Sequence, residues 1–175
     1  MDLANKLGIG LSTIRPRFLR LFGEEYTKVA KHKLDGSLLN YKGQLAEYLG
    51  LEYLRLKGID VNDVRGKAIL KGTLKRPDFV VDDTFIEIKS YYINLNKRKV
   101  KGYLNIIDDY LRKETKDGKI LTRGIIISLG GFSEEVKKKA HEDGLLLIGY
   151  KDLKVTFEEN NQIKFLELLS ELVGF

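Results

Sequence analysis

The most informative segment of the chain is Lys75-Arg-Pro-Asp-Phe-Val-Val-Asp-Asp-Thr-Phe-Ile-Glu-Ile-Lys89. Two short runs rich in β-branched and aromatic residues flank Asp82-Asp83, which predicts a β-hairpin with a tight turn. If these two residues form the turn, Asp78 lies across the ladder from Glu87, with Cβ atoms roughly 4.5–5.5 Å apart. A four-residue loop keeps this pairing and a three-residue loop breaks it. Lys89 follows Glu87 by two positions, so its side chain emerges on the same face.

The other hairpin residues are mostly apolar on both faces, so we expect the hairpin inside a sheet that is covered on both sides. Two carboxylates that face each other there repel, and partial burial strengthens the repulsion. A divalent cation between Asp78 and Glu87 would remove the repulsion, so the pattern predicts a metal site. The alternative is an ordinary salt-bridged strand pair, with Glu87 on Lys89 or Asp78 on Arg76.

The composition limits which metal ions this site could bind. The chain has 175 residues, no cysteine and two histidines, His32 and His141, which excludes disulfide frameworks, Cys-ligated zinc and Fe–S clusters. A metal would then be held by oxygen atoms, which favours Mg²⁺ or Mn²⁺ over zinc. No apolar run reaches the roughly 18–20 residues that span a bilayer, and no signal peptide opens the chain. We therefore expect a soluble, cytoplasmic protein with no membrane partner.

The rest of the sequence predicts an α/β fold. The run Gly124–Ser128 is apolar enough for a strand that is buried on both faces. The order of helical and strand patterns indicates one mixed central sheet flanked by helices. The expected elements are helices over about 41–57, 97–114, 133–141 and 161–173, and strands over about 77–81, 84–91, 124–128 and 145–150.

The chain is expected to begin with a helical N-terminal extension over residues 1–38, followed by one domain over 39–175. Residues 2–22 fit two short helices around a turn. The pair is either a DNA-reading helix-turn-helix or a plain helical appendage. Its second helix carries three arginines, Arg15, Arg17 and Arg20.

The charge balance suits a polyanionic partner, because 31 Lys and Arg against 25 Asp and Glu give a net charge of +6. Basic residues gather before and after the hairpin, where we expect them to bind the backbone phosphates of nucleic acid. The alternative is two solvated loops. The first group is Arg65, Lys67, Lys71, Lys75 and Arg76, and the second is Lys97, Arg98, Lys99 and Lys101.

A third carboxylate for the metal site is expected from a neighbouring helix. The helix over 41–57 offers Glu47 and Glu52. At about 100° per residue, each of them lies beside an apolar side of that helix. Periodicity therefore does not choose between the two.

Pro77-Asp78 followed by Glu87-Ile88-Lys89 resembles the signature of the PD-(D/E)XK nuclease superfamily. The closer likeness is to archaeal-type Holliday junction resolvases, and it covers about residues 42–128. The first forty residues and the extended C-terminal part have no counterpart in the small resolvases. The insertion before Asp78 is also longer and more basic than theirs.

The preceding helix adds to the resemblance. In these resolvases a Lys-Gly pair precedes a helical Glu by four positions and the helix ends at a Gly. Here Lys42-Gly43, Glu47 and Gly58 follow that pattern, which favours Glu47 over Glu52. The family also carries an arginine in the strand region before the catalytic Asp, and Arg65 is similar.

The resemblance implies a restriction-endonuclease-like core and metal-assisted hydrolysis of DNA phosphodiester bonds. Asp78 and Glu87 would bind one or two Mg²⁺ ions, for which Mn²⁺ would substitute, with help from the Ile88 carbonyl. Lys89 would position the attacking water and stabilise charge on the phosphate. Glu47 would orient the second metal ion or its water shell. The implied catalytic residues are thus Glu47, Asp78, Glu87 and Lys89.

The implied partner is branched or duplex DNA, with Lys42 added to the phosphate-binding residues. A resolvase cuts two strands symmetrically, so it would be a two-fold homodimer. Two other functions remain open from the sequence. One is a non-cleaving DNA-binding regulator on a nuclease scaffold, and the other is an RNA-processing nuclease.

Overall fold

A computed structural model describes residues 38–60, 70–96 and 102–173. The chain divides into two compact units, Met1–Leu45 and Ala46–Phe175. The expected helices within residues 2–22 and the extension over 1–38 fall almost wholly outside the described residues. The elements are α3 (Leu38–Leu56), β1 (Phe79–Val81), β2 (Thr84–Lys89), α4 (Tyr103–Tyr110), β3 (Arg123–Ser128), α5 (Glu134–Glu142), β4 (Leu146–Gly149), α6 (Tyr150–Glu159) and α7 (Ile163–Val173).

The predicted hairpin is confirmed. β1 pairs antiparallel with β2, with Phe79 opposite Ile86 and Val81 opposite Thr84. The turn is Asp82-Asp83, and Asp82 adopts a positive φ of 52°, a conformation that aspartate tolerates better than most residues. The register carries on to bring Asp78 opposite Glu87.

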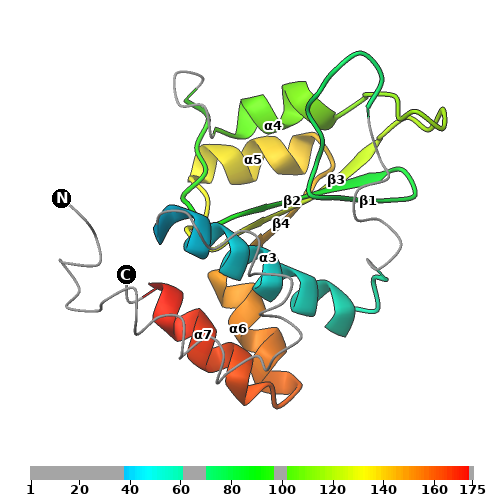
Figure 1. The fold of residues 1–175 in the computed structure, drawn as a ribbon. Helices are drawn as coiled ribbons and strands as arrows, with labels where there is room; N and C mark the ends of the chain where they lie inside the picture. The colour runs from blue at the N-terminus through cyan, green and yellow to red at the C-terminus, as the bar shows by residue number, and fades with distance from the viewer. Residues whose placement is uncertain (1–37, 61–69, 97–101, 174–175) are drawn as a thin grey trace. The chain divides into compact units, whose positions relative to one another are not determined.

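The predicted mixed sheet is also confirmed, with strand order β1-β2-β3-β4 (Figure 1). β2 pairs parallel with β3, and β3 pairs parallel with β4. Ile126 and Ile127 are neighbours in β3 and so face opposite sides of the sheet, yet both are fully buried. Both faces of the sheet are therefore covered.

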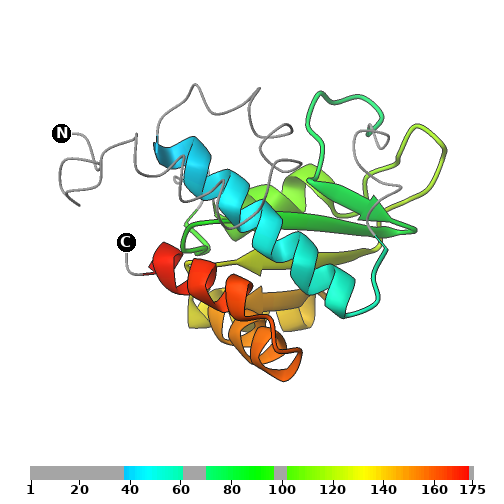
Figure 2. The same ribbon diagram turned by 60° about the horizontal axis from the view of Figure 1, so that its bottom comes forward.

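Helices α4 and α5 cover one face, where Tyr103 and Val136 join a cluster of buried residues with Phe85 and Ile126. Helices α6 and α7, with the part of α3 from Ala46 onward, cover the other face (Figures 1 and 2). α3 approaches the sheet so closely that a Cβ atom on Gly50 would lie 2.6 Å from Cδ1 of Ile88.

The helices of the second layer also pack on one another. The ring of Tyr48 on α3 stacks on Phe165 of α7, with ring centroids 5.2 Å apart, and Phe157 of α6 lies 5.4 Å from Phe165. In the described part of the chain, none of the helices is long and apolar enough to cross a membrane.

The predicted helix over 97–114 is wrong at its C-terminal end. α4 ends at Tyr110, because Leu111 is extended and Arg112 adopts a positive φ of 62°. The chain then turns back as a small hairpin, in which Leu121 N–H donates to the Lys113 carbonyl at 2.9 Å. The start of the predicted helix, at 97–101, lies outside the described residues.

The sequence reading also missed α6. We expected a strand through Tyr150, but β4 ends at Gly149 and the helix begins at the next residue. The side chain of Asp152 accepts a hydrogen bond from Gly149 N–H at 2.7 Å, which stabilises the first turn of the helix. The other strand and helix predictions are confirmed to within three residues at each end, and Ser133 caps α5.

Replacing Gly130 by alanine is expected to destabilise the fold by about 1–3 kcal/mol, because the new methyl group would overlap backbone atoms. A Cβ atom at this position would lie 2.2 Å from Tyr92 N and 2.4 Å from the carbonyl carbon of Tyr91. Gly43→Ala is the matched control, because a Cβ atom there meets nothing within 4 Å and the helix prefers alanine. Urea unfolding of both variants tests this, and a Gly130→Ala variant no less stable than Gly43→Ala would contradict it.

Candidate active site at the end of the β-hairpin

Asp78 and Glu87 are held against each other by the backbone of the hairpin. The Asp78 N–H donates to Oε2 of Glu87 at 3.3 Å, and the Ile88 N–H donates to Oδ2 of Asp78 at 2.7 Å. Glu87 is thus oriented by the backbone N–H of Asp78, and Asp78 by the backbone N–H of the residue that follows Glu87. The hairpin register accounts for this exchange, because Phe79 lies opposite Ile86 and the next pair along the ladder is Asp78 and Glu87.

Lys89 completes the group on the same face. Its ammonium forms an ion pair with Oε1 of Glu87 and lies 3.9 Å from Oδ2 of Asp78. The Glu87 side chain is only 5% exposed, whereas those of Asp78 and Lys89 are 25% and 23% exposed. Glu87 is therefore the buried member of the site, whereas Asp78 and Lys89 reach solvent.

The ion pair with Lys89 does not fully compensate the charge of Glu87. Burial, followed by the nearby charge of Asp78, raises the pKa of Glu87 to about 7 in spite of Lys89. Burial also disfavours the ammonium of Lys89, but the two carboxylates and the hydrogen bond to Glu87 outweigh it, so the pKa of Lys89 lies above its usual value. The salt-bridged pair considered from the sequence is therefore present, yet it leaves an excess of negative charge.

The Ile88 carbonyl faces the same side as Asp78. The next carbonyl along β2, that of Lys89, accepts from Leu129 N–H at 2.9 Å on the β3 side. Successive peptide groups of a strand point to opposite sides, so the Ile88 carbonyl points to the β1 side. There its own N–H already reaches Asp78. Three groups that could bind a cation through oxygen thus lie at this edge of the hairpin: the carboxylates of Asp78 and Glu87 and the Ile88 carbonyl.

Tyr110 is a neighbour of the site that the sequence did not indicate. Its hydroxyl donates to the Arg76 carbonyl at 3.0 Å, two residues before Asp78. Burial and then the charges of Glu87 and Asp78 raise the pKa of Tyr110. Tyr91 is half-buried near the site. Burial raises its pKa, and the charges of Lys89, Glu87 and Asp78 have smaller effects.

The structure does not bring Glu47 into the site. Within the described ranges, no group of three or more His, Asp or Glu side chains lies close enough together to hold a metal ion. The reason is geometric: α3 packs on the face of β2 that carries Ile88, whereas the Glu87 side chain points to the opposite face. Glu52, the other candidate, is paired with Arg55 through two hydrogen bonds of 2.9 and 2.5 Å.

The basic residues expected to bind phosphates are described only in part. Lys71 forms an ion pair with Glu114, and Lys75 lies 2.7 Å from both carboxylate oxygens of Asp109. Arg76 is exposed, and Lys42 belongs to the first compact unit. The remaining candidates lie outside the described residues: Arg65, Lys67, Lys97, Arg98, Lys99 and Lys101.

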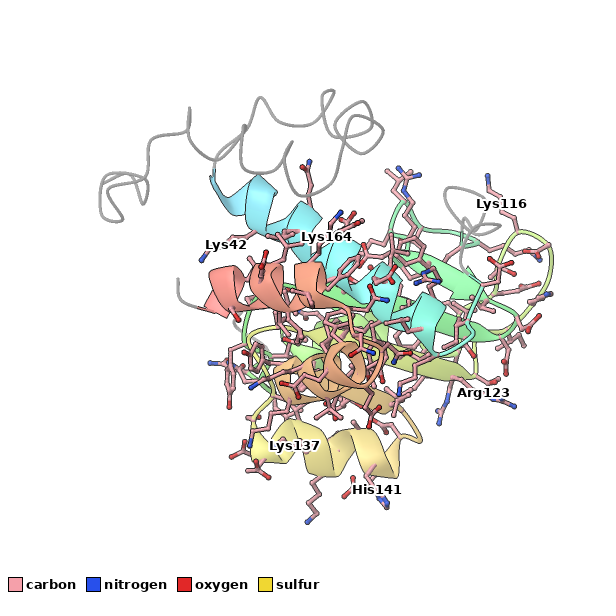
Figure 3. All side chains as sticks on the ribbon, turned by 90° about the horizontal axis from the view of Figure 1, so that it is seen from below. Lys42, Lys116, Arg123, Lys137, His141 and Lys164 are labelled. Carbon is pink, nitrogen blue, oxygen red and sulfur yellow. The ribbon has the colours of Figure 1, made fainter. Side chains whose placement is uncertain are left out.

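A third basic group was missed because it lies on the unexpected hairpin between α4 and β3. Figure 3 shows Lys116 and Arg123 pointing away from the ribbon, whereas His141 projects from the outer side of α5. Lys119 and Arg123 lie 3.8 and 3.6 Å from Asp82 and Asp83 of the β1–β2 turn. The exposed members of this group are Arg112, Lys113, Lys116, Lys119 and Arg123.

The arrangement can bind a hard cation between two carboxylates and a carbonyl, with a charged lysine alongside. Comparison of the chain with protein-family models, curated proteins and solved structures finds no match.

Proposed function

We propose that this chain is a Mg²⁺-dependent DNA endonuclease with a restriction-endonuclease-like core. The observation that carries the proposal is the pair of carboxylates, Asp78 and Glu87, which face each other at a largely buried site with Lys89 beside them. The resemblance of the hairpin to the PD-(D/E)XK signature supports the same function. The substrate proposed from that resemblance is a Holliday junction or related branched DNA, cut by a homodimer.

The donor set fits Mg²⁺ or Mn²⁺. Both are hard cations that proteins hold through one or two carboxylates, leaving the other positions to water and substrate phosphates. Burial and then the charge of Asp78 raise the pKa of Glu87 to about 7, so the ionised carboxylate is disfavoured, and a divalent cation beside it would favour that form. Asp78 and Glu87 would hold the ion together with the Ile88 carbonyl. The role of Glu47 rests on the resemblance alone.

A bound Mg²⁺ ion would supply charge neutralisation at the scissile phosphate and a bound water of lowered pKa. The protein's own part is positional and electrostatic. Backbone N–H groups hold Asp78 and Glu87 in fixed orientations, and preorganised charges of this kind lower the barrier without reorganising during the reaction. Without a bound ion, the carboxylates of Glu87 and Asp78 outweigh burial and raise the pKa of Lys89, which favours its ammonium form. It would therefore donate to the attacking water or the phosphate oxygens rather than act as a general base.

A cleavage assay tests the proposal. Labelled four-way junction, linear duplex, single-stranded DNA and RNA are incubated with the protein in Mg²⁺, Mn²⁺ or EDTA. We expect cutting in both metals, none in EDTA and none with Asp78→Asn, with the junction cut fastest. The variant controls for a contaminating nuclease.

The other outcomes separate the alternatives. Tight DNA binding without cleavage in either metal would reject the nuclease and leave a non-cleaving DNA-binding protein. Metal-dependent cutting of RNA in preference to every DNA would instead identify an RNA-processing nuclease.

A further inference from the structure

Leu74 lies on the segment that leads into β1, four residues before Asp78. It is 98% exposed, more than any other large apolar side chain in the described ranges; the next is Ile163 at 68%. A single exposed leucine is common on protein surfaces and needs no explanation by itself. Leu74 differs from such a residue in two ways: its segment is anchored to the rest of the domain, and basic residues lie next to it in the sequence.

The segment around Leu74 is fastened on both sides. On the N-terminal side, the Lys71 N–H donates to the Glu114 carbonyl at 2.8 Å, and the two side chains form an ion pair. On the C-terminal side, Lys75 pairs with Asp109 at 2.7 Å, and the Arg76 carbonyl accepts from Tyr110. The backbone is therefore tied to the rest of the domain on both sides of Leu74.

The turn itself is also fixed. Gly72 has a φ of 71°, in the left-handed region that favours glycine. The Lys75 N–H donates to Oγ1 of Thr73 at 3.1 Å, across Leu74. The leucine side chain is therefore presented to solvent by a defined loop.

The surroundings of Leu74 suit DNA. Lys71, Lys75 and Arg76 are all exposed. Lys71 and Lys75 are held in ion pairs with Glu114 and Asp109, so Arg76 is the nearby cation that would meet a phosphate. A chain covers at most about 3.6 Å per residue, which places Leu74 within roughly 14 Å of Asp78. That distance corresponds to about four base steps of a DNA strand.

We propose that Leu74 is a specificity-determining residue that inserts as an apolar wedge against an unstacked base of branched DNA, while Arg76 beside it binds a phosphate. The inference rests on the proposed function, since it takes DNA as the substrate. Leucine is among the residues that DNA-binding proteins insert between base steps. Bases at a branch point are more easily unstacked than those within a duplex, so the contact favours branched DNA over linear DNA.

Binding assays in EDTA, where cleavage is absent, test the wedge. A four-way junction carries 2-aminopurine at the branch point, and a linear duplex carries it at an internal position. We expect Leu74→Ala to weaken junction binding about tenfold, to leave duplex binding within about twofold and to remove the fluorescence rise on the junction. Leu74→Met keeps the apolar volume and should restore both. Ile163→Ala is the matched control, with an exposed apolar residue on α7.

The outcomes distinguish this inference from the proposed function. If the wild type never cleaves but the Leu74→Ala defect is confined to the junction, the wedge stands and the nuclease falls. The wedge is overturned if Leu74→Ala weakens binding of the junction and of the duplex equally, or if it weakens binding of neither DNA. This holds whether or not the protein cleaves. Sedimentation tests a further alternative. If Leu74→Ala dissociates a dimer but leaves the 2-aminopurine fluorescence rise on the junction intact, a second copy of this chain covers the leucine. That result would overturn the inference.

Discussion

Glu87→Gln is expected to lower Mg²⁺-dependent DNA cleavage by at least about a thousandfold. The substitution keeps the size of a side chain that is only 5% exposed but removes one of the two charges proposed to hold the cation. A catalytic metal ion contributes several kcal/mol to transition-state stabilisation, and about 4 kcal/mol corresponds to a thousandfold in rate. Single-turnover cleavage of the preferred substrate in saturating Mg²⁺ gives the measurement.

Glu52→Gln is the matched control for this variant. Glu52 is an acid of the same domain that pairs with Arg55 on α3, and its loss should change the rate by less than about twofold. Glu87→Gln that keeps more than a tenth of the wild-type rate would contradict the assigned role. Glu47→Gln belongs in the same series, because a loss as large as that of Glu87→Gln would require α3 to bring Glu47 to the metal.

The hairpin could be predicted from the sequence because everything that defines it is local. The turn residues Asp82-Asp83 and the two apolar runs beside them fix the register, and the register puts Asp78 opposite Glu87. The same reasoning placed Lys89 on the face of Glu87, where the ion pair between them is found. A period of two residues therefore predicted most of the site.

The elements that were missed depend on backbone conformations that residue type signals weakly. Arg112 ends α4 with a positive φ, which is uncommon for a residue with a long side chain. The helix α6 begins directly after a strand, and its first turn is capped from within by Asp152. Hydrophobic periodicity predicts neither feature, because each depends on the local geometry of one residue.

The contacts that surround the site depend on tertiary packing. Tyr110 reaches the Arg76 carbonyl, and Asp109 reaches Lys75, only because α4 lies along the segment before β1. Residues 34 positions apart make these contacts, and no periodicity within one element predicts them. The choice between Glu47 and Glu52 stayed open on periodicity for the same reason. Helix periodicity gives the buried side of a helix, but not which sheet face that side will cover.

The free energy of unfolding of the wild type, measured relative to Glu87→Gln, is expected to fall by about 3 kcal/mol as the pH rises from 4.5 to above 7. Burial and the charge of Asp78 raise the folded-state pKa of Glu87 from 4.5 to about 7. Below 4.5 the carboxyl is protonated in both folded and unfolded chains, so the stabilising contribution of the raised pKa is fully present. As the pH rises through 7, the folded state must give up that proton at a buried site, and the contribution is lost. Each unit of pKa shift is worth about 1.36 kcal/mol.

Mg²⁺ should reverse that loss in the wild type alone. A cation held by Asp78 and Glu87 favours the ionised carboxyl, so at pH 8 the wild type regains stability in Mg²⁺ while Glu87→Gln responds little. Urea unfolding at pH 5, 6, 7 and 8, with and without Mg²⁺, measures both effects. Parallel curves for the two proteins would show that Glu87 does not carry the charge assigned to it. A divergence with pH that Mg²⁺ fails to close would keep the buried charge but remove the metal from the site.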